Sequence, residues 1–214
     1  VTGNDERGRL SVLNEMMGLY RKCDMSNEAL TAAADALECC RRSGLDDTVT
    51  GATTYINAAT VDKAFGNAQE AIPLYDRAQT IYENNLAPDD ERLGGAYNNK
   101  GLALTDLHRF DEARIYFHKA IDIMKRIDGK EPEQAISYLN LADVDEAEYG
   151  QVDASEKTDA LIQKADELLE TKGLSYDGNY AFVCEKCAPV FGHYGYFLLQ
   201  RKYEERAESI YERA

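Results

Sequence analysis

Three asparagines lie at the same phase of three predicted helices, and their side chains have the chemistry to bind a peptide backbone. Asn57, Asn99 and Asn140 are separated by 42 and 41 residues. Asparagine is a poor helix former, so helix stability does not explain its presence at these positions. Each amide offers acceptor and donor groups that suit the backbone of an extended ligand, whatever the ligand's side chains. The three amides are predicted to line a binding groove; the alternative is that they bridge adjacent helices or cap a local backbone group.

Residues at neighbouring phases of the same helices extend this candidate groove. Its other predicted members are Asn98, Asn14, Arg21, Lys63, Asp143, Glu146 and His193. The segment 131–171 contains twelve acidic residues and two lysines, so this part of the chain favours a ligand that carries Lys or Arg. For each of these charges, the alternative is an ordinary solvated helix face.

The remaining residues of chemical interest do not form a catalytic arrangement. Cys184 and Cys187 have the spacing of a metal-binding pair, with His193 as a nearby candidate, but a zinc site needs four ligands and no second pair follows. We interpret the two cysteines as packing residues on one helix rather than as a metal or redox site. The histidines lie in separate segments without a recognisable nucleophile, and the sequence has no phosphate-binding glycine loop. The prediction is a protein with no enzymatic activity and no cofactor.

The helices that carry these residues follow from a repeated pattern. In the stretch 96–124, small and large residues fall at the spacing of one helix-turn-helix unit. The small residues allow two helices to approach closely, and the large residues fill the space between them. The pattern Gly101, Ala113, Phe117 and Ala120 recurs 42 residues earlier as Ala59, Ala71, Tyr75 and Ala78, and again as Met17, Ala29, Ala33 and Ala36. A fixed period of this length indicates a repeat architecture.

The pattern continues to the end of the chain with one irregularity. About four residues are inserted near 152–157, relative to the period of the earlier units. The fifth unit is predicted to form its first-helix face from Phe191, Tyr194, Gly195 and Leu198, and its second-helix face from Ala207, Tyr211 and Ala214.

Five repeats and ten helices are therefore predicted. The repeats span about 8–47, 48–89, 90–130, 131–175 and 176–214, as a single array. The helices are expected at about 8–23, 26–43, 48–65, 67–84, 90–107, 109–127, 132–149, 152–171, 178–200 and 202–214. Pro189 predicts a kink or a restart near Ala188. Because a solenoid needs polar terminal repeats and the last predicted helix is short, we expect the array to be truncated at one or both ends.

The positions of small and aromatic residues within the repeat resemble those of tetratricopeptide repeat (TPR) proteins. The segment 81–90, followed by Tyr97-Asn98-Asn99, is similar to the linker and first helix of the kinesin-light-chain type of repeat. The overall likeness is to bacterial proteins of unassigned role. The resemblance implies an all-α, right-handed α-α superhelix whose first helices line a concave groove for peptides or partner segments. Asp62 and Asp145 stand where the family commonly has an aromatic residue, and we expect carboxylates that are paired or reach solvent there.

The function implied by the resemblance is a protein–protein interaction module, a scaffold or adaptor that binds a peptide or partner segment without catalysis. The alternative is a peptide-sensing regulatory module that controls an effector domain outside this sequence. Self-association through terminal repeats or the groove agrees with either function.

Composition indicates which classes of partner and which cellular compartment suit this chain. The chain has 39 acidic and 24 basic residues and a net charge of -15, which disfavours nucleic acid and anionic membranes as partners. No apolar run approaches the length of a membrane span. The five cysteines are an odd number, which suits a reducing cytosol better than a disulfide framework, so a cytoplasmic location is predicted.

Overall fold

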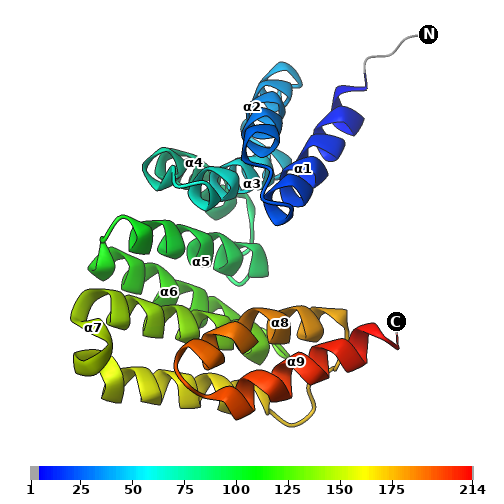
Figure 1. Ribbon diagram of the computed structural model, residues 1–214. Coiled ribbons are helices and arrows are strands. Elements are labelled where there is room, and N and C mark those ends of the chain that lie inside the picture. Colours follow the sequence, from blue (N-terminus) through cyan, green and yellow to red (C-terminus); the bar gives the residue numbers. More distant parts are fainter. Residues whose placement is uncertain (1–4, 214) are drawn as a thin grey trace. The chain divides into compact units, whose positions relative to one another are not determined.

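The computed structural model describes residues 5–213, apart from the side chain at position 153, and its regular elements in that range are α-helices (Figure 1). The helices are α1 (Glu6–Lys22), α2 (Ser26–Arg42), α3 (Val49–Ala64), α4 (Ala68–Asn85), α5 (Glu91–Asp106), α6 (Phe110–Met124), α7 (Glu131–Leu169), α8 (Gly178–His193) and α9 (Phe197–Tyr211). Because α7 consists of two helices joined at Gly150, the ten predicted helices are confirmed. Ala214, predicted to belong to the last helix face, lies outside the described residues. Within them, every helix is too short or too polar to cross a lipid bilayer.

The chain divides into two compact units, and the division falls between α5 and α6. The first unit ends at Arg109 and contains α1 to α5, whereas the second begins at Phe110 and contains α6 to α9. The two helices predicted to form the third repeat therefore belong to different units. That the five repeats form one continuous array stays a prediction.

In the first unit, consecutive helices pack as pairs and the first helices of successive repeats lie together. The pairs are α1 with α2 and α3 with α4, and α3 also contacts both α1 and α5 (Figure 1). The small residues of the repeat pattern lie inside this packing, since Ala29, Ala36, Ala59, Ala71 and Ala78 are all fully buried. Their burial agrees with the predicted place of these alanines between helices.

In the second unit, α8 and α9 form a pair whose core contains stacked aromatic rings. The rings of Phe191 and Tyr203 stack with centroids 5.3 Å apart, and the Tyr180 hydroxyl donates to the carbonyl of Leu169 at 2.9 Å. Cys184 and Cys187 are buried in the same core, which agrees with their interpretation as packing residues.

A residue with positive φ follows the first helix of each of the first four repeats, at intervals of 42 residues. Asp24, Gly66, His108 and Gly150 have φ values of 55°, 84°, 56° and 79°. This region of backbone space is open to glycine and disfavours other residues, among which aspartate and histidine are comparatively tolerated. The turns of these four repeats therefore share one residue with positive φ at the same position.

The first three of these turns close with the same backbone hydrogen bond. The amide after the positive-φ residue donates to a carbonyl in the last turn of the helix, which is the hydrogen bond of a Schellman cap. The three bonds join Met25 to Tyr20 at 2.9 Å, Asn67 to Asp62 at 2.8 Å and Arg109 to Leu104 at 2.9 Å. Carbonyls that the helix ends would leave without partners are thereby satisfied.

Gly150 makes the fourth turn without any intervening loop. Its φ of 79° and ψ of 160° break the helical path, yet helical residues flank it on both sides. The predicted insertion near 152–157 consequently lies inside a helix, where it lengthens the second half of α7.

The fifth repeat differs from its prediction in the position of its turn. The turn lies at Tyr194–Tyr196, because Gly195 has a φ of 81° and the Tyr196 amide donates to the Phe191 carbonyl at 2.8 Å. Helix α8 therefore ends at residue 193 instead of 200, and α9 begins at 197 instead of 202. Leu198, predicted on the first-helix face, belongs to α9 and is 86% exposed.

The predicted restart near Ala188 is wrong, because α8 continues through Pro189 to its end. A proline deprives one carbonyl of its helical partner. Pro189 is exposed, so solvent can reach that side of the helix.

The two aspartates that depart from the repeat pattern are both bonded, as expected. Arg114 on α6 donates from Nη2 to Asp145 Oδ1 on α7 at 2.6 Å, and it also pairs with Glu148. The Arg114 and Asp145 side chains are only 21% and 13% exposed. Burial raises the pKa of Asp62, whose carboxylate accepts a hydrogen bond from the Asn67 side chain.

The turn geometry predicts opposite effects for two glycine substitutions in the first unit. Gly66→Ala should lower the free energy of unfolding by about 1 kcal/mol, because alanine is strained at this positive φ although no atom obstructs its Cβ. Gly95→Ala, inside α5 and equally unobstructed, should raise it by about 0.5–1 kcal/mol through helix propensity. Urea unfolding followed by circular dichroism measures both changes, and a loss at both sites would contradict the backbone explanation.

The ion pair between α6 and α7 should be worth more than an exposed pair. Arg114→Met is expected to lower the free energy of unfolding by about 2–3 kcal/mol, because it leaves a half-buried carboxylate without its partner. The control Arg201→Met removes the exposed pair of Arg201 with Glu205 and should cost less than about 0.5 kcal/mol. Equal losses in urea unfolding would show that burial does not set the strength of the Arg114 pair.

Candidate functional site

Two predicted asparagines of the first unit bond to each other and join α1 to α3. Asn57 donates from Nδ2 to Asn14 Oδ1 at 2.7 Å. Asn14 in turn donates to the carbonyl of Leu10 at 2.9 Å and to the buried Thr54 hydroxyl at 3.1 Å. We call Asn14, Thr54 and Asn57 the amide bridge. For Asn57, this is the helix-bridging alternative weighed from the sequence.

The amide bridge borders a cavity of about 620 Å³ in the first unit, which we call the amide groove. The groove is lined by Arg7, Leu10, Ser11, Asn14, Glu15, Leu45, Thr48, Val49, Thr50, Thr53, Asn57 and Arg92. These residues come from α1, from α3 and the loop before it, and from the start of α5. The lining is rich in amides and hydroxyls, so it offers both donors and acceptors to a bound chain.

A smaller cavity of about 60 Å³ also contacts the amide bridge. Asn14 and Asn57 line it together with Arg21, which is half-buried on α1. The structure thus brings three predicted site residues, Asn14, Asn57 and Arg21, to one place.

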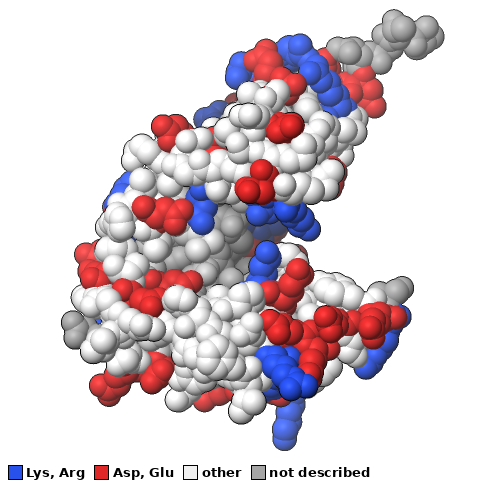
Figure 2. Space-filling view, viewed as in Figure 1, with Lys and Arg blue, Asp and Glu red and all other residues white. Residues whose placement is uncertain are grey.

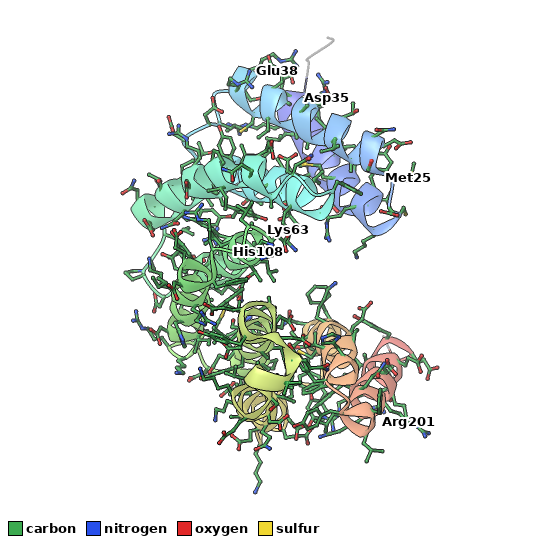
Figure 3. All side chains as sticks on the ribbon, turned by 60° about the vertical axis from the view of Figure 1, so that its left-hand side comes forward. Met25, Asp35, Glu38, Lys63, His108 and Arg201 are labelled. Atoms are coloured by element: carbon green, nitrogen blue, oxygen red, sulfur yellow. The ribbon has the colours of Figure 1, made fainter. Side chains whose placement is uncertain are left out.

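Asn99 and Lys63, two other predicted site residues of this unit, differ in whether their side chains have a bonding partner. Asn99 is half-buried on α5, and its side chain forms no hydrogen bond with any residue in the range 5–213. Lys63 instead pairs with Asp106 at 3.4 Å, next to the end of α5 where His108 lies (Figure 3). The Asn99 amide therefore has no bonding partner among residues 5–213, whereas the Lys63 charge is paired. Asn98 is half-buried beside Asn99.

In the second unit, three predicted site residues form one cluster. His193 Nε2 lies 2.6 Å from Glu146 Oε2, and the hydroxyl of the next residue, Tyr194, donates to Asp143 Oδ1 at 2.9 Å. The structure therefore brings Asp143, Glu146 and His193 together within this unit, while their role in a binding groove stays a prediction. Asn140 is 9% exposed on the same helix as the two carboxylates, and its alignment with Asn57 and Asn99 stays a prediction.

This cluster borders a cavity of about 150 Å³, which we call the acidic pocket. The pocket is lined by Glu146, Gln151, Ser155, Thr158, Asp159 and Tyr194. Asp159 accepts a hydrogen bond from the Tyr196 hydroxyl at 2.8 Å. No lysine or arginine is among the lining residues, although acidic and basic side chains both occur over the face of each unit that Figure 2 presents.

Burial changes the acidities of the groups behind the pocket. It raises the pKa of Asp143, and the nearby Glu146 charge acts in the same direction, while Tyr194 and His193 oppose the shift. The pKa of Tyr194 is also raised, first by burial and then by the Asp143 carboxylate. The tyrosine therefore stays protonated and keeps its hydrogen for Asp143.

Some residues of the amide bridge and of the acidic pocket were not predicted from the sequence. Thr54 was not distinguished from other helical threonines, although it lies 40 residues from Asn14 and bonds to it. Thr158 and Asp159 follow the insertion, so their positions within the repeat could not be assigned from the period. The insertion itself was the available signal, because departures from a period are where repeat proteins acquire local features.

Comparison with known proteins identifies the repeats. Residues 9–84 and 92–158 match the family model described as tetratricopeptide repeat. The chain belongs to the tetratricopeptide repeat family. No curated protein matches it by sequence.

Two solved structures show the same fold as this TPR chain, and a third is less similar. One is a putative kinesin light chain with nearly identical TPR-like repeats from Podosopora anserina, with a TM-score of 0.64, 16% identity, and 96% of each chain covered. A variant of that protein gives a TM-score of 0.65 at 16% identity, with 99% of this chain and 100% of the other covered. BtubC (BKLC) from P. vanneervenii gives a TM-score of 0.49 at 14% identity, with 98% and 92% covered.

The family and the shared fold confirm the predicted class, an all-α TPR solenoid. TPR repeats are typical protein–protein interaction scaffolds, so a role in binding a protein partner follows from the family. The ligand of this particular array has to be argued from its own residues.

The amide bridge predicts a difference in stability between two asparagines. Asn14→Ala should lower the free energy of unfolding by about 1–3 kcal/mol, because it removes the partners of Asn57 and of the buried Thr54. Asn99→Ala should change it by less than about 0.5 kcal/mol, because its amide bonds to no residue within 5–213. Urea unfolding at neutral pH measures both values, and the reverse order would contradict the assignment of Asn14 as the structural residue.

Proposed function

We propose that this TPR protein binds an extended segment of a partner protein in the amide groove. The observation that carries the proposal is the groove itself, which is bordered by the paired amides of Asn14 and Asn57. The remaining oxygen capacity of Asn57 can accept from a backbone N–H, and exposed hydroxyls such as that of Ser11 can donate to a backbone carbonyl. Such contacts bind a peptide backbone without selecting its side chains.

The charged residues of the two units favour a partner that carries both acidic and basic residues. Arg7 and Arg92 line the amide groove, and Arg92 is held by Asp90, from Nη2 to Oδ2, at 2.6 Å. The fourth repeat is strongly acidic, with twelve acidic residues and two lysines in 131–171, so it favours basic residues in the partner. The protein would then act as a scaffold or adaptor without catalysis. A peptide-sensing regulatory role and self-association stay predictions.

A peptide-display selection against the immobilised 214-residue chain tests the proposal. Selected peptides should bind with a dissociation constant that rises at least about tenfold for Ser11→Trp, because the large ring fills the groove from an exposed position. Asn57→Ala should raise it about fivefold by removing an amide that lines the groove and one hydrogen bond to the ligand. Isothermal titration calorimetry measures both effects, and circular dichroism melts verify that the variants are folded.

Matched controls come from the second helix of the second repeat. Thr80→Trp and Asn84→Ala change exposed residues of α4 that do not line the amide groove. Both should leave the dissociation constant within about twofold of the parent value. If the control variants weakened binding as much as the groove variants, the assigned groove would be wrong.

A further inference from the structure

The acidic pocket contains a buried hydroxyl that the protein itself does not satisfy. Thr158 is 3% exposed and lies on the buried face of α7 between Ala154 and Ile162. Its Oγ1 has no hydrogen-bond partner in the part of the chain that the structure describes. Since buried polar atoms are nearly always bonded, a group from outside the chain is needed to satisfy this hydroxyl.

The same pocket offers carboxylate oxygens beyond those already used. Glu146 accepts through Oε2 from His193, and Asp159 accepts through Oδ1 from Tyr196. A carboxylate accepts through both of its oxygens, so each side chain can accept another hydrogen bond. With the Thr158 hydroxyl, these side chains give the pocket three acceptor groups, two of which carry negative charge; the Gln151 amide and the Ser155 hydroxyl add polar lining.

This arrangement selects a compact organic cation. Two carboxylates without a lysine or arginine in the lining repel anions. Across residues 5–213, no group of three or more His, Cys, Asp and Glu side chains is placed to hold a metal ion. A primary ammonium is a compact charge with three donors, which matches the three acceptor groups in a volume of about 150 Å³.

A guanidinium is a poorer match for the same pocket. Its donors lie in a rigid planar fork that pairs best with both oxygens of one carboxylate. Here one oxygen of each carboxylate is already bonded, by His193 and by Tyr196. The pocket therefore distinguishes lysine from arginine.

We infer that the acidic pocket binds the ammonium group of a lysine side chain of the partner protein. In this arrangement, Glu146, Asp159 and Thr158 accept the three ammonium hydrogens. The Tyr194 ring, fixed by its hydrogen bond to Asp143, contacts the methylene stem of the lysine. The inference rests on the proposed function, since it supplies the lysine from a bound partner.

An NMR titration with Nα-acetyl-lysine N-methylamide tests the pocket directly on the 214-residue chain at pH 7. Backbone amide shifts should change at Glu146, Ser155, Asp159 and Tyr194, and should saturate. The norleucine analogue, which lacks the charge, should cause no saturable change. The arginine analogue should bind at least about threefold more weakly, because its planar fork does not fit the acceptors.

Three variants assign the binding to named atoms. Asp159→Asn should raise the dissociation constant of the lysine analogue at least about fivefold by removing one charge. Thr158→Val keeps the shape of the side chain, removes its acceptor and should raise the constant about twofold to threefold. The control Glu156→Gln removes one charge from an exposed position on the same helix, outside the pocket lining, and should leave it unchanged.

Three results would overturn the inference. Equal weakening by Glu156→Gln and Asp159→Asn would show general attraction to an acidic surface. Tighter binding of butane-1,4-diamine than of the lysine analogue would assign the pocket to free diamines. Failure of the lysine titration alongside groove-dependent peptide binding would reject this inference and leave the proposed function standing. Absence of groove-dependent peptides would reject the proposed function instead.

Discussion

The structure depends on one backbone constraint, the positive φ that follows the first helix of each repeat. At such a residue the chain leaves the helix, the freed amides return to the last helical carbonyls, and the next helix begins in a fixed direction. The spacing of Asp24, Gly66, His108 and Gly150 is constant, so a positive φ recurs at the same place in each of the first four repeats. Alanines at matching positions of these repeats are buried, as Ala29, Ala71 and Ala113 are.

Much of the fold could be predicted from the sequence because helix packing is a periodic property. Small residues such as Ala71 and Ala78 must be buried if the period is correct, and both are. The fifth repeat was less predictable, because the position of its turn depends on a single glycine, Gly195. Glycine is also found inside helices, so its presence alone does not mark a turn. A glycine in the sequence does not reveal the sign of its φ.

The candidate site was less predictable than the fold because side-chain partners are not periodic. The sequence placed Asn14 and Asn57 in one candidate groove but did not indicate the hydrogen bond between them, which makes one amide group structural. Charges show the same limit. Lys63, a predicted groove residue, pairs with Asp106 on α5, a contact that the repeat pattern does not indicate. The groups left to bind a partner are the hydrogen-bond donors and acceptors that are not bonded within the protein.

Gly150 and the insertion after it have a consequence for how a repeat protein changes. Four additional residues add one helical turn and rotate the following side chains by only about 40°, so the core face of the helix is retained. The additional turn includes Ser155 and ends just before Thr158 and Asp159, which line the acidic pocket with it. A repeat can therefore gain a polar pocket by growing one turn longer, while the repeats before it keep their period.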